Sequence, residues 1–256
     1  MKYNNIITKQ ENNAFIITIN RENKLNALNI ETLQEIKHAV LSVQNNKEIR
    51  GIILTGKGNK AFAAGADIAE FKDFNDEQGT KMSIDGHSVM NTLENSKIPT
   101  IAAVNGFSLG GGNELAMSCH IRIASENAKF GQPEVNLGLP PGYGGTQRLV
   151  QLIGKGRALE LLITADIINA QQALEYGLIT KIVPIENLLE YCKELINKIT
   201  EKSPSAVAKV IECVNKHFES TQSGFETENK EFGNSFGTSD FIEGTNAFNE
   251  KRKPKF

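Results

Sequence analysis

Short β-branched and apolar runs alternate with helical patterns over the first two-thirds of this 256-residue chain. Runs of this length and composition are typical of buried strands. The segment that follows Asn29 has apolar residues at spacings of three and four, and Asn29 is a suitable helix N-cap. The alternation predicts an α/β layer architecture. The expected strands are residues 14–20 (AFIITIN), 51–56 (GIILTG), 100–106 (TIAAVNG) and 120–125 (HIRIAS), and the expected helices are residues 29–45 and 80–95.

The pattern changes after Pro184, where every following segment looks helical. Breaks between these helices are expected at Pro204, Gly224 and Gly237, because proline suits a first turn and glycine suits a helix end. We therefore divide the chain into a core, residues 1–195, and a helical segment, residues 196–256, that ends in the basic tail KRKPKF.

Composition excludes several classes of protein. The formal net charge of −2 lacks the basic excess of a nucleic-acid-binding protein. The three cysteines are odd in number and widely spaced, which predicts a cytoplasmic protein. The chain starts with polar residues and has no apolar run near ~20 residues, so we expect no signal peptide and no membrane span. Cys119 lies beside His120, but no second pair follows, so we interpret both as structural residues and expect no metal site.

Three consecutive glycines, Gly110 to Gly112, separate an expected strand from the helical run NELAMS. A helix start offers free N–H groups, and glycine lets a ligand oxygen approach them closely. This pattern favours an oxyanion hole, with the small-residue loop AFAAGAD as the second donor. Two nucleotide-binding motifs fit less well. Gly58 replaces the Ser or Thr of a P-loop, and Leu115 replaces the third glycine of a dinucleotide fingerprint.

Two glutamates accompany the glycine loops. Glu114 follows the three glycines, and Glu134 lies in the nearly uncharged stretch KFGQPEVNLGLPPGYGGTQRL. A glutamate is usually a surface residue. Two carboxylates beside apolar segments and tight loops favour acid–base chemistry instead, because burial and mutual repulsion raise a carboxyl pKa toward neutrality.

With these motifs in this order, the chain resembles the enoyl-CoA hydratase (crotonase) family. The resemblance rests on AFAAGADI, AAVNGFSLGGGNELAMSC, FGQPEVNLGLPPGYGGTQRL and ALEYGLITKIVP, and it runs from ITINRENKLNALN to the basic tail. It implies an α/β fold built as a spiral of β-β-α units with a C-terminal helical trimerisation segment. It also implies homotrimers that pair into homohexamers, an acyl-CoA substrate and no metal or redox cofactor.

The resemblance also assigns roles to individual residues. Ala66 and Gly111 match the oxyanion-hole positions, and Glu114 and Glu134 match the two catalytic glutamates. Gly142 matches the glycine whose N–H helps to place the water. The residues that match segments bordering CoA are Lys24, Ala27, Ala64, Asp67 and Ile68. The glycine run would then let the thioester oxygen reach the Gly111 N–H.

The expected reaction is reversible hydration of short-chain 2-trans-enoyl-CoA to 3-hydroxyacyl-CoA, with Glu114 as base and Glu134 as acid. It is a lyase reaction of fatty acid metabolism and β-oxidation. A dual hydratase/isomerase, another acyl-CoA reaction on the same fold, and a non-catalytic acyl-CoA-binding or RNA-binding relative are the alternatives. Asn113 and Pro140 depart from the commonest family pattern and leave the acyl chain-length preference open.

Overall fold

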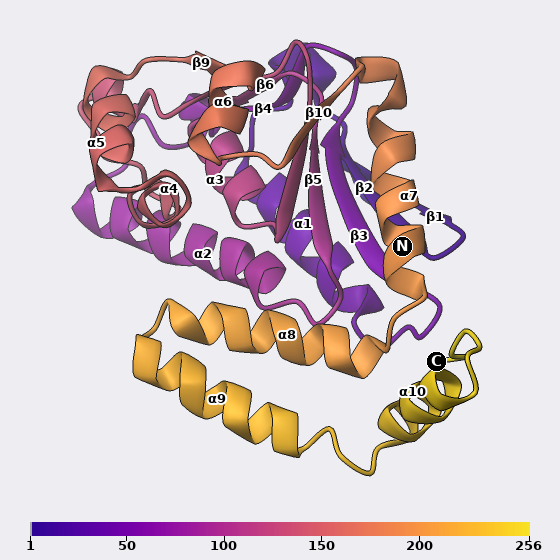
Figure 1. The fold of residues 1–256 in the computed structure, drawn as a ribbon. Coiled ribbons are helices and arrows are strands. Elements are labelled where there is room, and N and C mark those ends of the chain that lie inside the picture. The colour runs from indigo at the N-terminus through magenta and orange to yellow at the C-terminus, as the bar shows by residue number, and fades with distance from the viewer. Residues whose placement is uncertain (1) are drawn as a thin grey trace.

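The computed structural model describes residues 2–256 and contains two β-sheets (Figure 1). The larger sheet has six strands, and all of its pairings except β1–β2 are parallel. Its order is β1 (Ile6–Glu11), β2 (Ala14–Ile19), β3 (Gly51–Gly56), β5 (Thr100–Val104), β7 (Ile121–Ser125) and β10 (Lys181–Val183). The smaller sheet has the order β4 (Ala61–Ala64), β6 (Phe107–Leu109), β8 (Lys129–Gly131) and β9 (Ile168–Asn169).

The chain alternates between the two sheets in a repeating unit. Each of the strands β3, β5 and β7 in the larger sheet is followed directly by a strand of the smaller sheet, and then by helical structure. The first two units end in α2 (Asp76–Glu94) and α3 (Gly111–Met117), and the third leads to α4 (Gly145–Ile153). The expected α/β spiral of β-β-α units is thus confirmed.

Both faces of the larger sheet are covered, which explains why its central strands are apolar throughout. In β3, Ile52 and Leu54 belong to one buried cluster and Ile53 belongs to another. The first cluster includes side chains of α1 (Ile30–Val43) and α2, and the second includes Leu188, Cys192 and Ile196 of α7 (Leu188–Thr200). The remaining core helices are α5 (Lys155–Thr164) and α6 (Ala170–Tyr176).

The expected strands and the helix capped by Asn29 are confirmed. The Asn29 side chain accepts a hydrogen bond from the Thr32 N–H at the start of α1. Helix α2 begins at Asp76 rather than near residue 80, because Asn75 and Gln78 form a capping box. Strand β1 was not anticipated, since it pairs only with β2, antiparallel, and exposes much of its surface, so its sequence lacks an apolar run.

Three helices lie outside the core at the C-terminal end (Figure 1): α8 (Pro204–His217), α9 (Thr221–Gly233) and α10 (Ser239–Asn249). The expected breaks at Pro204 and Gly237 are confirmed, and the break at Gly224 is wrong. Ser220 caps α9, and Gly224 lies inside it, where a Cβ would be only 3.1 Å from the His217 Cα of α8. The absence of a side chain at Gly224 therefore allows α9 to approach α8 closely. The division at residue 196 stays a prediction, and α7 crosses it.

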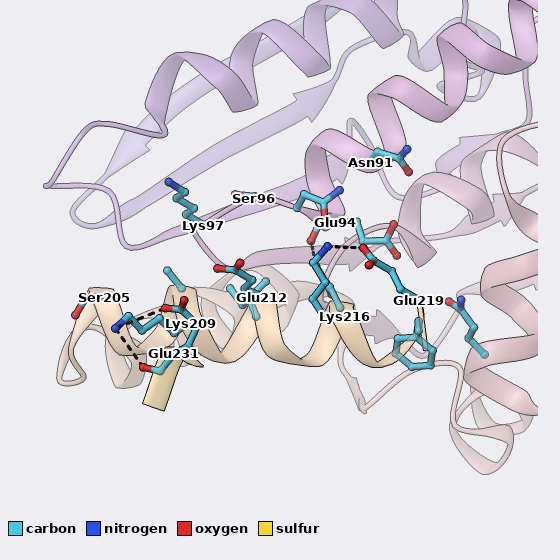
Figure 2. A pocket seen from close by; sticks show the side chains of 16 residues that line it. Asn91, Glu94, Ser96, Lys97, Ser205, Lys209, Glu212, Lys216, Glu219 and Glu231 are labelled. Atoms are coloured by element: carbon cyan, nitrogen blue, oxygen red, sulfur yellow. Dashed lines mark hydrogen bonds and ion pairs between the residues drawn. The ribbon is translucent and has the colours of Figure 1, made fainter. Parts of the chain in front are cut away.

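A polar cavity of about 800 Å³ separates α8 from the end of α2 (Figure 2). Two of its cations are paired with nearby carboxylates: Lys216 with Glu219, in the turn after α8, and Lys209 with Glu231 of α9. Across it, the Asn215 side chain donates to the Glu94 carbonyl at 2.6 Å. No residue of α8 is fully buried, so the terminal helices rest on the core through few apolar contacts.

Within residues 2–256, no helix combines the length and the hydropathy that a bilayer-spanning segment needs.

Candidate active site

Two backbone N–H groups meet at one edge of the smaller sheet. Strands β4 and β6 are parallel neighbours that end together, with Ala64 opposite Leu109. The chain then turns through Gly65 (φ +94°) to Ala66, and through Gly110 to Gly111. Gly110 has φ +50° and ψ −127°, a conformation that favours glycine. A Cβ placed on Gly111 would lie 3.5 Å from the Ala66 nitrogen, so the two amides are adjacent.

Neither amide has an acceptor among the described residues. Leu28 pairs with Ala66 as a parallel bridge in which Leu28 N donates to Gly65 O and Asp67 N donates to Leu28 O. That pairing leaves the Ala66 N–H on the opposite side of the chain. The Gly111 N–H is at the start of α3, where helix N–H groups are free and the dipole favours negative charge. Together the two donors form a site for an anionic or strongly polarised oxygen.

Glu114 is buried one turn into α3, with 1% of its surface exposed. Its Oε1 accepts hydrogen bonds from the N–H groups of Tyr143 at 2.8 Å and Gly145 at 2.7 Å. Burial raises the pKa of Glu114 to about 7; the two N–H bonds oppose the shift, and the nearby Glu134 charge adds to it. A carboxyl group with this pKa exchanges protons readily near neutral pH.

Glu134 begins the short 3₁₀ helix Glu134–Leu137 and is half-buried. A Cβ placed on Gly110 would lie 2.9 Å from Glu134 Oε1, so the glycine makes room for this carboxyl group. Glu134 Oε2 is buried and has no hydrogen-bond partner in residues 2–256. Burial raises the pKa of Glu134. The structure therefore brings together the two glutamates and the two amides that the sequence singled out.

The loop that holds Glu114 is braced by Arg148 of α4. The Arg148 guanidinium forms a bidentate ion pair with Glu94 of α2, with a closest approach of 2.6 Å. The same guanidinium donates to the Tyr143 carbonyl at 3.1 Å. Gly142 lies in this loop, and its carbonyl accepts from Ser83 Oγ of α2 at 2.6 Å. The brace keeps the Tyr143 and Gly145 N–H groups directed at Glu114.

The five residues expected to border CoA lie on two chain segments held side by side. Besides the bonds of Leu28, Ala64 N donates to Leu25 O at 3.1 Å. These two segments form one strip of chain beside Ala66. The strip contains Lys24, Ala27, Ala64, Asp67 and Ile68. Lys24 and the Ile68 side chain are exposed, whereas the Asp67 carboxylate is paired with Arg21 at 2.8 Å.

Sequence reasoning missed Arg21, Arg148 and the ring of Tyr143. Arg21 links the two segments of the strip, because it also donates to the Ala27 carbonyl. The burial of Arg148 and its pairing with Glu94 are visible only in the structure, so the sequence offered no signal for its role. Asn113, which departs from the family pattern, is buried, and its Oδ1 has no partner within the described chain.

Cys119 and His120 have structural contacts. His120 Nδ1 accepts from Thr100 N at 3.0 Å, and its Nε2 contacts the Glu94 carbonyl at 2.9 Å. Burial raises the pKa of the Cys119 thiol to about 12. No group of three or more His, Cys, Asp or Glu residues that could hold a metal ion is present in residues 2–256.

Comparison with known proteins gives consistent matches over the whole chain. Residues 9–256 match the family model described as enoyl-CoA hydratase/isomerase. The chain is 47% identical to the short-chain-enoyl-CoA hydratase of Clostridium acetobutylicum, over 99% of this chain and 97% of that protein. It is 45% identical to the crotonyl-CoA hydratase of Syntrophomonas wolfei, over 100% and 99% of the two chains. The crystal structure of an enoyl-CoA hydratase from Bacillus anthracis superposes with a TM-score of 0.93, at 38% identity and 99% coverage of each chain.

Proposed function

This chain belongs to the enoyl-CoA hydratase/isomerase family, and we propose that it uses Glu114, Glu134, Ala66 and Gly111 to hydrate short-chain 2-trans-enoyl-CoA reversibly. It is an enoyl-CoA hydratase, a lyase of fatty acid metabolism that acts on acyl-CoA. The observation that carries the assignment of residues is the pair of free amides next to two carboxyl groups, one buried and one half-buried, whose pKa values are both raised.

The substrate thioester carbonyl would accept hydrogen bonds from the N–H groups of Ala66 and Gly111. Addition of water to the β-carbon moves electron density onto this oxygen and gives it enolate character. Donors that are already aimed at the oxygen stabilise the transition state more than the ground state. Their preorganisation follows from the aligned ends of β4 and β6.

The two carboxyl groups would divide the proton transfers. Glu114, held by two N–H groups on Oε1, takes a proton from water while the water oxygen bonds to the β-carbon. Glu134, whose Oε2 is free of protein partners, supplies the proton to the α-carbon. One water is consumed: its oxygen and one hydrogen stay on the β-carbon, and the α-carbon proton comes from Glu134. The proton that Glu114 took from the water is released, and Glu134 takes one up, before the next turnover.

We extend the proposal to the cofactor requirement, assembly and location. Each step above is assigned to a group of this chain, so no metal or redox cofactor is required. Exposed apolar side chains on the terminal helices support a homotrimer or homohexamer. The basic tail would help to bind CoA, and the Gly142 N–H would help to place the water. Three free thiols support a cytoplasmic location.

The test is hydration of crotonyl-CoA by the purified protein. Loss of the conjugated enoyl-thioester absorbance, with a product heavier by one water, is the expected result, and full activity should survive EDTA. The double variant Glu114→Gln/Glu134→Gln is the matched control. A folded wild-type protein that leaves enoyl-CoA of four to ten carbons unchanged would contradict the proposal. A 3-enoyl-CoA substrate in the same assay separates a dual hydratase/isomerase from a simple hydratase.

A further inference from the structure

The ring of Tyr143 is inserted between α2 and α3 beside the proposed oxyanion hole. A Cβ placed on Gly86 of α2 would lie 2.1 Å from Tyr143 Cδ1, and one placed on Gly111 would lie 3.3 Å from Tyr143 Cδ2. The ring thus fills the space next to two glycines. Only 4% of Tyr143 is exposed. It is a large, buried side chain next to Gly111.

The ring is held in this place from several directions. The Tyr143 N–H is bonded to Glu114, and its carbonyl is bonded to Arg148. The preceding carbonyl, of Gly142, is bonded to Ser83 of α2. Since Ser83 and Gly86 are three residues apart, they lie on the same face of α2. Displacing the ring would therefore disturb the N–H groups that hold Glu114.

The site has one open and one closed end. The strip next to Ala66 contains the exposed residues Lys24 and Ile68. Glu114 and the Tyr143 ring, which lies next to Gly111, are buried. CoA is much larger than a short acyl group and must occupy the open end. With the thioester oxygen at Ala66 and Gly111, the acyl tail then points toward the closed end.

We propose that the Tyr143 ring is the end wall of the acyl pocket and determines the preference of this enzyme for short acyl chains. The inference rests on the proposed hydratase function and names its substrate range. The additional methylene groups of a longer acyl chain would need the volume that the Tyr143 ring occupies. In a shaped pocket, one methylene changes kcat/KM by about 10–200-fold. The kcat/KM of the wild-type enzyme should therefore fall at least about tenfold between four-carbon and ten-carbon 2-enoyl-CoA.

The experiment compares kcat/KM for crotonyl-CoA and 2-decenoyl-CoA in wild type, Tyr143→Leu and Tyr143→Ala. Both smaller side chains should raise the decenoyl-to-crotonyl ratio, by about tenfold or more for Tyr143→Ala. Tyr143→Phe retains the ring and should keep the wild-type ratio. Tyr176→Ala removes a ring that packs on Arg157 instead, and it should also keep that ratio. Circular dichroism checks the fold of each variant.

Calorimetric binding of butanoyl-CoA and decanoyl-CoA provides a readout that does not depend on turnover. Wild type should bind decanoyl-CoA less tightly than Tyr143→Ala and Tyr143→Leu do, because only the wild-type pocket contains the ring. Equal use of both chain lengths by wild type, or an unchanged ratio in a folded small variant, would overturn the inference. A wild-type protein that binds both thioesters but hydrates neither enoyl-CoA refutes the proposed function instead, and the binding preference still decides the role of the ring.

Discussion

At the scale of single residues, Glu114 and Glu134 differ in their surroundings. Glu114 has two N–H donors on one oxygen, whereas Glu134 has a buried oxygen with no donor in the described chain. A carboxylate that accepts hydrogen bonds is oriented, and one that lacks them is available to a ligand. This asymmetry supports different proton-transfer roles for the two groups.

Replacement of either glutamate by glutamine should lower kcat by about 10²–10⁴-fold, because each group moves a proton in the same transition state. KM should change little. The double variant should lose much less than the product of the single losses, since the two groups act as a unit. Steady-state kinetics on crotonyl-CoA measures all three variants. A single variant that keeps more than about a tenth of the wild-type kcat would remove that residue from the mechanism.

The raised pKa of Glu114 also predicts a stability effect. A carboxyl group with a folded pKa of about 7 and an ordinary unfolded value binds more protons in the folded state between those two values. The free energy of unfolding therefore falls as pH rises through this window, by about 3 kcal/mol in total. Glu114→Gln keeps an acceptor for the Tyr143 and Gly145 N–H groups and has no charge to bury.

Glu114→Gln should accordingly be more stable than wild type at pH 8, and this advantage should disappear toward pH 5. Urea unfolding at the two pH values measures it. Glu212→Gln, an exposed glutamate of α8, is the control and should show no such dependence. Equal stability of wild type and Glu114→Gln at pH 8 would mean that ionisation of the buried Glu114 does not lower the free energy of unfolding.

At the scale of elements, α2, α4 and the loop between residues 141 and 145 act as one unit around Arg148. This side chain is 8% exposed, while its partner Glu94 is 33% exposed. Arg148→Met should lower the free energy of unfolding by about 2–3 kcal/mol, less than for a fully buried pair because Glu94 can regain water. It should also lower kcat, because the loop that holds Glu114 loses its brace.

Denaturant unfolding and crotonyl-CoA kinetics test this role. Arg157→Met is the matched control, since Arg157 is exposed on α5 and contacts the Tyr176 ring rather than a carboxylate. If Arg148→Met were as stable and as active as Arg157→Met, the brace would have no energetic importance.

At the scale of the whole molecule, the terminal helices expose several large apolar side chains. Val210, Phe232 and Phe248 are 62%, 68% and 83% exposed on α8, α9 and α10. Large exposed apolar patches mark contact surfaces, and soluble homo-oligomers are usually symmetric. Light scattering should give the mass of three or six chains, and Phe232→Ser/Phe248→Ser should lower it. Leu41→Ser, on the exposed side of α1, should leave it unchanged. A monomeric wild type would contradict the assembly.

The sequence by itself determined four strands of the larger sheet, the helix capped by Asn29, the two glycine loops and the choice of Glu114 and Glu134 as candidate catalytic residues. These features have local causes: residue period, a cap at Asn29, and turns at glycines such as Gly110. The tertiary structure decided the rest. The proximity of the Ala66 and Gly111 amides depends on the register of β4 and β6, and the pKa of Glu114 depends on its burial against residues 143–145. The places of Arg148 and the Tyr143 ring depend on α2, more than fifty residues away in the chain. Contacts between segments so distant in sequence leave no periodic pattern, because each partner meets the other only after both have packed.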